Sequence, residues 1–444
     1  MVLRDPRTLR MAPTPTVERG AYARRRFRPP RRLSCHIEER QREWDLYHEA
    51  LRLEHPWYVK SRAFDAHENR LDIYIGVDTR ATFTCSVCDT PHQTYYDLDV
   101  DDQAWRHLDF WEYKSFLHAP HPRVQCSVYG KVKYALVPWG RCNSSFTIAF
   151  EMHVLTLAKD MPVLCAARLV REWDKRLWRI IHHYVARALD RQDLAPLTRV
   201  AMDETSSRRG HHYVTVVMDS DTRRVVFATP GKDAAAIGAF REHLRAHGGH
   251  PKQIQEYTSD MSAAFMRGMA DVFPQAQHTV DKFHVMKLVN EAVDEVRRAE
   301  QVKTPELKKT RYIWLKNEQD LTKKQQDTLA TLSASHLRTA KAYQLKITFQ
   351  GLWRYPARMA GLYFDLWSYW AAHSRLEPMI AVAKTLKAFR DRILRWFETG
   401  MTTGMLEAMN GLIQAAKRKA RGYRTTKNLI AMIYLIGGGL RLQG

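Results

Sequence analysis

Between residues 197 and 230 the chain alternates apolar and polar positions in three short runs, LTRVAMD, HHYVTVVMD and RRVVFATP, separated by tight polar turns. Such alternation is typical of β-strands. The apolar spacing changes to a helical period in DAAAIGAFREHLRAHG and becomes strand-like again in IQEYTSD. A second helical run, AAFMRGMADVF, and a short strand in AQHTVDKFHV complete the segment. The pattern predicts the order strand-strand-strand-helix-strand-helix-strand.

This order is that of an RNase H-like core, in which a mixed sheet carries helices on its faces. The flanking segments have other periods. Residues 70–140 have the pattern of short strands and turns, residues 146–190 are helical, and residues 285–400 are almost wholly helical. The expected fold is an α/β RNase H-like catalytic core with a large all-helical insertion, preceded by a small β-rich zinc-finger-like module and a helix-turn-helix.

Changes of period and composition predict the domain boundaries. The expected parts are a basic, disordered arm (1–36), a zinc-finger-like module (37–145), a helix-turn-helix (146–192), the first part of the core (193–285), the helical insertion (286–400) and the helix of Glu407 with a basic C-terminal segment (401–444). An over-long translation start would explain the arginine-rich arm equally well. The insertion carries four tryptophans, Trp314, Trp353, Trp367 and Trp370. The simpler interpretation is that they pack between helices, and the alternative is that they stack on a displaced base.

The composition favours a polyanionic partner. The chain has 70 Lys and Arg against 48 Asp and Glu, a net charge of +22, together with 12 Trp and 19 Tyr that can stack on bases. Six cysteines are too few for a disulfide scaffold of this length and favour a reducing compartment. No apolar run reaches the roughly 20 residues that span a bilayer, and the N-terminal arm lacks an apolar signal core. We therefore expect no membrane partner and a cytoplasmic location.

Three carboxylates stand where an uncompensated charge would be costly. Asp203 and Asp260 are expected to end two of the predicted strands, and Glu407 lies in the helical pattern TGMLEAMNG after the insertion. Carboxylates are hard ligands for divalent ions, and two such ions can neutralise the attacking and leaving oxygens of a phosphodiester. The three residues therefore predict a metal-dependent phosphodiester enzyme that uses two Mg²⁺ (or Mn²⁺) ions.

Other acidic residues compete for these roles: Glu204 or Asp219 could replace Asp203, and Asp281 could replace Asp260. Asp281 and His284 follow the last predicted strand, three residues apart at a helix start. That spacing lets them share one face and bond each other or the substrate. The alternative is a helix-capping Asp281 beside a packed histidine.

The helix of Glu407 becomes basic beyond that residue, since no acidic residue follows it and seven Lys and Arg do. Asn410, Gln414, Lys417 and Arg421 recur at helical spacing and predict one polar stripe opposite an apolar stripe that begins at Leu406. The polar stripe is either a solvated face or a ridge along a phosphate backbone, and we favour DNA contact. The expected contacts on this helix and just after it are Asn410, Lys417, Arg418, Lys419, Arg421 and Arg424.

The helical runs PVLCAARLV and DKRLWRIIHHYVARAL are joined by a tight turn, as in a DNA-reading helix-turn-helix. An ordinary amphipathic hairpin with a solvated basic face is the alternative. In the first case the second helix would contact DNA through Lys175, Arg176, Arg179 and Arg187.

Cys85, Cys88 and Cys126 suggest a structural Zn²⁺ site, which needs four Cys or His ligands in a tetrahedron. The second pair is incomplete, because Tyr129 stands three residues beyond Cys126 and is a poor zinc ligand. The fourth ligand could come from one of four histidines, His92, His107, His118 or His121, or the module could be a zinc-free relic.

Several motifs occur in one order along residues 47–440: HPWYV, CSVC, WRHLD, PRVQC, VPWG, SSFTIAFE, AMDETSSRRGHHYVTVV, YTSDMS, DKFHV and EAMNGLIQAAKRKARGYR. In these motifs the chain resembles the bacterial insertion-sequence transposases of the ISL-three family, which are DDE enzymes. The resemblance implies a zinc module and a helix-turn-helix for recognition of transposon ends. By motif it implies Asp203, Asp260 and Glu407 as the metal-binding triad, with Asp281 and His284 beside it. Tyr129 departs from the family pattern, which has Cys or His there.

We therefore expect a DNA transposase that binds the terminal inverted repeats of its insertion sequence and catalyses metal-dependent cleavage and strand transfer. Its partners would be double-stranded DNA, as transposon ends and target, and further copies of itself in a homodimer or higher oligomer at the bacterial nucleoid. The alternatives are a non-enzymatic, domesticated DNA-binding regulator and a structure-selective DNA nuclease.

Overall fold

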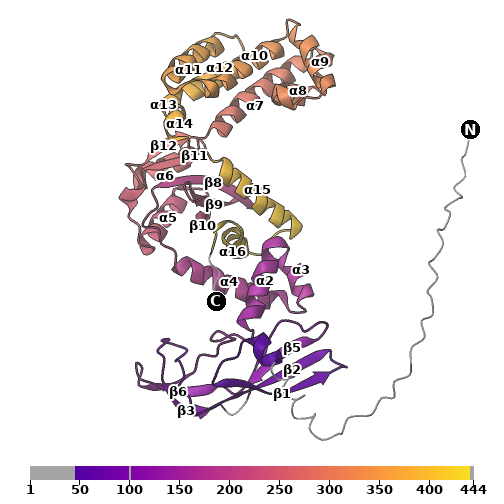
Figure 1. The fold of residues 1–444 in the computed structure, drawn as a ribbon. Coiled ribbons are helices and arrows are strands. Elements are labelled where there is room, and N and C mark those ends of the chain that lie inside the picture. The colour runs from indigo at the N-terminus through magenta and orange to yellow at the C-terminus, as the bar shows by residue number, and fades with distance from the viewer. Residues whose placement is uncertain (1–45, 100–101, 441–444) are drawn as a thin grey trace, which may run out of the picture. The chain divides into compact units, whose positions relative to one another are not determined.

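The fold is seen in a computed structural model that describes residues 46–99 and 102–440 (Figure 1). The predicted basic arm, 1–36, lies outside the described residues. The described residues form two compact units, one of residues 46–63, 73–99, 102–103 and 118–138, and a second of residues 64–72, 104–117 and 139–440. Among the described helices, none is long and apolar enough to cross a membrane.

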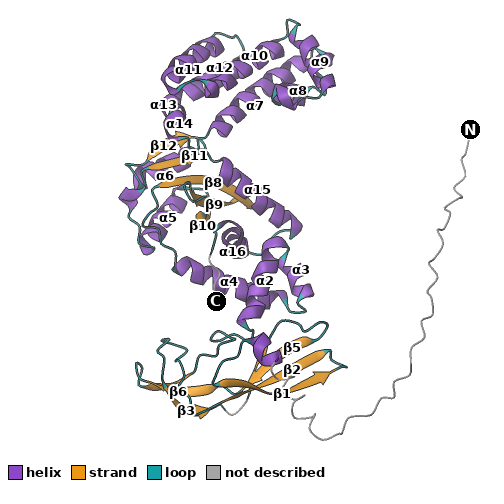
Figure 2. Ribbon diagram, in the orientation of Figure 1, coloured by secondary structure: helices purple, strands orange, loops and turns teal. Residues whose placement is uncertain are grey.

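The N-terminal region is built from strands, which confirms the β-rich character predicted for residues 70–140 (Figure 2). A four-stranded sheet has the order β1-β2-β5-β4, and a three-stranded antiparallel sheet has the order β3-β6-β7. The first strand begins before residue 70, where the β-rich pattern was predicted to start, and within the module predicted at 37–145. Their bounds are β1 Trp57–Asp65, β2 Arg70–Val77, β3 Thr94–Leu98, β4 Gln103–Arg106, β5 Lys114–Ala119, β6 Pro122–Cys126 and β7 Lys131–Tyr134.

Three helices follow in the segment predicted to be helical, and the last two match the two predicted runs: α2 Ile148–Asp160, α3 Val163–Leu169 and α4 Asp174–Asp190. The side chain of Thr147 caps α2 by accepting a hydrogen bond from the backbone N–H of Phe150. Pro162 stands at the N-cap of α3, where its missing N–H costs nothing. Apolar faces of all three helices share one core.

The central sheet has the order β10-β9-β8-β11-β12. Strands β8 Arg199–Arg208, β9 His212–Asp219 and β10 Val225–Pro230 pair antiparallel, while β11 Glu256–Ser259 and β12 Gln277–Val280 run parallel to β8. Helices α5 Ala234–Ala246 and α6 Ala263–Val272 follow β10 and β11. The predicted order of strands and helices is therefore confirmed.

Alternate side chains of β8 enter two different cores, as the two-residue period of a strand requires. Val200 and Met202 pack with Phe240 of α5 and Phe265 of α6. Ala201, between them, belongs to the core on the other face, which also contains residues of α15 Gly404–Lys419 and α16 Thr426–Gly437. Helices thus cover both faces of the sheet, and β8 lies at its centre.

The insertion between β12 and α15 is helical, as predicted. Its core contains the fully buried Trp314, Phe349 and Trp367. The α-helices of the insertion are α7 Lys282–Gln301, α8 Arg311–Leu315, α9 Lys323–Ser333, α10 Arg338–Gly351, α11 Ala357–Ala372, α12 Glu377–Ala388, α13 Arg390–Leu394 and α14 Trp396–Thr399.

Candidate active site

Asp203 lies in the middle of a strand, so the prediction that it ends one is wrong. Strand β8 continues to Arg208, because its hairpin with β9 pairs residues as far as Arg208 with His212. Asp203 itself pairs with Val216. Its Oδ2 accepts a hydrogen bond of 2.7 Å from Nδ2 of Asn410 on α15. A helix far along the chain therefore holds this carboxylate.

Asp260 directly follows β11, as predicted, and accepts a hydrogen bond from the backbone N–H of Ser262 at 3.0 Å. Strand β11 runs parallel to β8 with Glu256 opposite Arg199 and Thr258 opposite Ala201. Continuing this register by two residues brings Asp260 level with Asp203. The two carboxylates thus come from adjacent parallel strands at the same level of the sheet.

Asp281 is fully buried and uses both carboxylate oxygens. Its Oδ2 caps α7 by accepting from the backbone N–H groups of Phe283 and His284. Its Oδ1 accepts from Oγ1 of Thr402 at 2.8 Å and from the backbone N–H of Thr403 at 3.0 Å. One side chain therefore joins the beginning of the insertion to the segment just before α15. The two threonines were missed in the sequence, although threonines before a helix are a common capping signal.

Glu407 lies in the first turn of α15, with its side chain 39% exposed. His284 connects it to Asp281: Nδ1 of His284 is 3.3 Å from Oδ2 of Asp281 and 3.8 Å from Oε1 of Glu407. Potential ligand atoms of these three residues all lie within 4.8 Å of one another. Among the described residues this is one of two such groups, and Asp203 and Asp260 lie outside it.

The electrostatics nevertheless connect all the acidic residues of this region. Burial raises the pKa of Asp203, and the charge of Asp260 adds to that effect. Burial also raises the pKa of Glu407, assisted by the charges of Asp281 and Asp203. Burial and the charge of Asp260 raise the pKa of Glu204 to about 7. A concentration of carboxylates that resist ionisation is what an unneutralised divalent-cation site should display.

The pKa values of His284 and Asp281 both shift so that the charged form is favoured, unlike those of the three carboxyl groups above. The hydrogen bond to Asp281 raises the pKa of His284, and the charges of Asp203 and Asp260 add to the shift. Burial alone would raise the pKa of Asp281, but bonds from His284, Thr402 and Thr403 lower it overall. Asp281 is therefore held as a carboxylate, and the imidazole beside it is favoured in its protonated form. The two roles that the sequence offered for Asp281, capping the helix and contacting His284, therefore occur together.

The polar stripe of α15 faces strand β8, which corrects its interpretation as an outward ridge. Besides the bond from Asn410 to Asp203, Gln414 donates to Oγ1 of Thr205, and Nζ of Lys417 donates to the carbonyl of Ser206 at 2.6 Å. The opposing apolar residues behave as predicted, with Leu406 and Ile413 buried. Amphipathic spacing identifies a polar face but not its partner, so the docking of this face on β8 was not foreseen.

The other basic residues at the end of α15 differ in their surroundings. Lys419 donates to the carbonyl of Asp160 at 2.7 Å. Arg418, Arg421 and Arg424 have exposed side chains. Arg421, at the end of the stripe, and Arg418 and Arg424, outside it, are therefore accessible basic side chains beyond Glu407.

In the predicted helix-turn-helix, Lys175 and Arg179 of α4 are exposed and Arg187 is half-buried. Arg176 is occupied within the protein, because it donates to Glu172 and to Oγ of Ser145 and lies 4.1 Å from the ring of Phe146. Further along α4, Nε2 of His182 is 2.9 Å from Oδ1 of Asn428 on α16, so α4 also contacts a helix from late in the chain.

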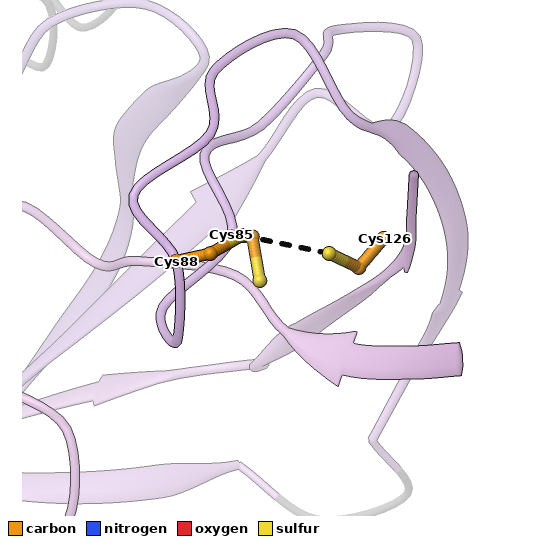
Figure 3. A group of neighbouring side chains, drawn as sticks. All are labelled: Cys85, Cys88 and Cys126. Atoms are coloured by element: carbon orange, nitrogen blue, oxygen red, sulfur yellow. Dashed lines mark hydrogen bonds between the residues drawn. The ribbon is translucent and has the colours of Figure 1, made fainter. Parts of the chain in front are cut away.

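The thiols of Cys85, Cys88 and Cys126 form the second group of potential ligands (Figure 3). The Sγ atoms of Cys88 and Cys126 are 3.5 Å apart. Hydrogen bonds from Thr90 lower the pKa of Cys88 to about 7, which favours the thiolate that binds metal. The donor set fits three ligands of a zinc ion.

No histidine joins this group among the described residues, so the expected histidine ligand is not found. His121 is instead within hydrogen-bonding distance of Gln103 and the carbonyl of Ala135. The ring of His118 stacks on Tyr74. The other two candidates approach threonine hydroxyls: His92 that of Thr82 and His107 that of Thr147.

Comparisons with known proteins match the chain in three consecutive parts. Residues 81–128 match the "zinc-finger of transposase IS204/IS1001/IS1096/IS1165", residues 135–185 the "Helix-turn-helix domain of transposase family ISL3", and residues 200–433 the DDE domain of that family, described as "Transposase". The chain is 31% identical over 383 residues to the transposase for insertion sequence element IS1557 of Mycobacterium tuberculosis, a match covering 78% of this chain and 84% of that protein. It is 27% identical over 376 residues to the transposase for insertion sequence element IS1001 of Bordetella parapertussis, covering 80% and 88%.

The chain belongs to the ISL3 family of DDE transposases. It is a DNA transposase with a zinc-finger domain, a DNA-binding helix-turn-helix and a DDE catalytic domain, in that order. DDE catalysis uses divalent metal, and the carboxylates around Asp203 provide hard oxygen ligands for it.

The raised pKa values predict that divalent cations bind this transposase more weakly at pH 6 than at pH 8. At the lower pH the carboxyl groups near Asp203, including Glu204 with its pKa of about 7, hold protons that a cation must displace. The same shifts make the metal-free fold lose stability as pH rises through these values. Thermal stabilisation by Mg²⁺ or Mn²⁺ should therefore be larger at pH 8.

Asp203→Asn should remove most of this stabilisation, while Asp271→Asn, at an exposed position on α6, should retain it. Equal stabilisation at the two pH values, or full stabilisation of the Asp203 variant, would contradict the prediction.

Proposed function

We propose that this transposase binds the terminal inverted repeats of its insertion sequence, cleaves at those ends and transfers the freed strand to target DNA. The observation that carries the proposal is the hydrogen bond from Asn410 of α15, the helix that also carries Glu407, to Asp203 on β8, the strand next to the one that Asp260 follows. The relatives IS1557 and IS1001 transposases are named for insertion sequence elements, which supports the choice of substrate.

The catalytic core is, in this proposal, RNase H-like. A five-stranded sheet with three antiparallel strands followed by two parallel ones, and with helices on both faces, supports it. The domain boundaries proposed from the sequence remain those given above, with the insertion at 286–400 separating Asp260 from Glu407.

Asp203, Asp260 and Glu407 are the residues that would hold two Mg²⁺ or Mn²⁺ ions. Bound ions would stabilise the charge on the attacking and leaving oxygens of the phosphodiester. Asn410 orients the Asp203 carboxylate through its 2.7 Å hydrogen bond. Asp281 and His284 position Glu407, since the imidazole of His284 lies between the carboxylates of Asp281 and Glu407. Water attacks first and leaves a 3′-hydroxyl, which then attacks the target phosphodiester.

DNA contact outside the catalytic centre is assigned to two exposed basic surfaces. On α4 it comprises Lys175 and Arg179, with Arg187 at its edge. Beyond Glu407 it comprises Arg418, Arg421 and Arg424. These residues neutralise phosphates and position the duplex. The transposase would act at the nucleoid as a homodimer or higher oligomer that pairs two ends.

Two other functions use the same domains. A domesticated regulator would bind the ends without cleaving them, and a structure-selective nuclease would cut without joining. Retention of all three carboxylates and of the Asp281–His284 pair favours the transposase over the regulator. Joined products containing target DNA separate it from the nuclease.

Glu407→Gln should lower end cleavage and strand transfer by at least about a thousandfold, the scale of losing an essential charge-stabilising group. Binding to end DNA should stay within a few-fold of wild type, because the basic surfaces are untouched. Cleavage and joining on labelled end duplexes with Mg²⁺, and gel-shift affinity without it, provide the measurements. Glu398→Gln, whose side chain is 73% exposed, is the matched control. Strand transfer by the Glu407 variant at the wild-type rate would overturn the assignment.

Affinity for end DNA should fall steeply with salt, with a slope in log K against log [salt] of about −0.9 per neutralised phosphate. Replacing Arg418 and Arg424 together by Ala should make the slope shallower by up to about 2 for this reason. A Lys303→Ala/Lys308→Ala variant removes two exposed charges elsewhere and should keep the slope. Fluorescence anisotropy over a salt series tests this, and equal slopes for both double variants would exclude the arginine contacts.

The zinc module should bind about one Zn²⁺ per chain through its three thiols. Cys126→Ser should lose the metal, because Cys126 is buried within the thiol group, whereas Cys142→Ser, at an exposed position, should keep it. Elemental analysis of protein purified without chelator measures the zinc. Retention of full zinc by the Cys126 variant would remove the site from the proposal.

A further inference from the structure

A cavity of about 660 Å³ lies in the insertion, immediately beside the candidate active site. Its wall includes Lys282, Phe283 and Met286 from the first turns of α7. The same turns carry His284 and follow the cap residue Asp281, whose side chains belong to the active site. Successive residues of one helix therefore serve both the cavity and the candidate active site.

The lining of the cavity combines three kinds of side chain. Phe283, Met286, Ile347 and Trp353 give aromatic and aliphatic surface. Lys282 and Arg354 supply positive charge, and no Asp or Glu occurs among the lining residues in the described part of the chain. The remaining polar groups are mostly amides, which both donate and accept hydrogen bonds: Asn317, Gln319, Gln326 and Gln350. This combination suits a flat, polar-edged ring attached to an anion.

Trp353 is held in a fixed orientation by other aromatic rings. Its ring meets Trp396 edge-on at 5.2 Å and stacks with Phe397 at 5.9 Å between centroids. The ammonium of Lys282 lies 4.7 Å from the Trp396 ring. The indole N–H of Trp353 is buried and has no acceptor among the described residues. A rigid indole at the wall of a cavity is prepared to receive a ligand with an aromatic face.

The tryptophans of the insertion differ in whether they line the cavity. Trp314 and Trp367 are fully buried in the helical core, and Trp370 is 46% exposed on α11. Of the four tryptophans considered for stacking, Trp353 is the one that lines the cavity.

We propose that the cavity receives a nucleobase displaced from the duplex at the transposon end, stacked against Trp353 and recognised at its edge by the surrounding amides. The inference rests on the proposed function, since it places the substrate of that reaction. A cavity of this volume is ample for one nucleotide. Lys282 and Arg354 contact the phosphates on either side of the displaced base. Stacking and edge contacts offset the cost of unpairing, and they draw the scissile phosphate toward Asp203 and Asp260.

The test is a double-mutant cycle between Trp353 and individual bases of the end DNA. Wild type and Trp353→Ala are each combined with intact end duplexes and with duplexes carrying one abasic site at successive positions around the cleavage site. With intact DNA, Trp353→Ala should lower the cleavage rate at least about fivefold, the loss expected from one base–aromatic stack. At one position, the abasic site should produce a similar loss in wild type and no further loss in the variant.

Controls separate stacking from folding. Trp370→Ala should match wild type, and Trp353→Phe should recover most of the rate because it retains an aromatic face. If Trp353→Ala fails to fold, Gln350→Ala, which removes an amide at the edge of the cavity, takes its place in the cycle. Independent, multiplying effects at every position would overturn the proposal.

The cycle is also measured on end-binding affinity without divalent metal. If the wild-type protein does not cleave at all, the proposed function is refuted. The cycle measured on binding then still shows whether the cavity receives a base. Titration with a deoxynucleoside monophosphate completes the set. Quenching of tryptophan fluorescence that needs Trp353, in the absence of any coupling to DNA bases, would assign the cavity to a free nucleotide instead and overturn the proposal.

Discussion

The carboxylate of Asp281 is the interaction on which the geometry of this active site depends. One oxygen caps α7, and the other binds Thr402 and Thr403, which lie 121 and 122 residues away in the sequence. The insertion therefore begins and ends at one buried side chain, and Glu407 follows within a turn of helix. A buried charge without these partners would be strongly unfavourable, so the bonds that stabilise Asp281 also determine where α15 starts.

A second constraint fixes the position of α15 on the sheet. Strand β8 is covered on both faces by apolar residues up to Met202, and its next residues are polar. Asn410 and Gln414 of α15 bond Asp203 and Thr205 at this point. Buried polar groups need such partners. The same bonds set the register between helix and strand. Glu407 lies one turn before Asn410 on α15, so this register also brings Glu407 close to the other carboxylates.

The elements of the core could be predicted from the sequence, because apolar alternation and helical spacing are local properties of the chain. The errors concern how segments pair and pack with one another. Strand β8 is longer than predicted because Arg208 pairs with His212, so Asp203 lies in the middle of the strand and not at its end. The polar face of α15 has a strand as its partner, and spacing alone does not distinguish a strand from solvent or DNA. The neighbours of the three thiols likewise depend on how separate strands pack, so no histidine could be chosen from spacing.

Helix α7 connects these constraints to the insertion. Asp281 and His284 face the acidic residues, while Lys282, Phe283 and Met286 line the neighbouring cavity. The N-cap and first turns of α7 carry both sets, so one helix start positions the cavity wall and the Asp281–His284 pair. Phe283 also approaches Gly404 at the start of α15, where an added Cβ would come within 3.1 Å of its ring. Glycine at that position allows α15 to approach closely, so the helix that carries Glu407 is packed against the cavity wall as well as tied to Asp281.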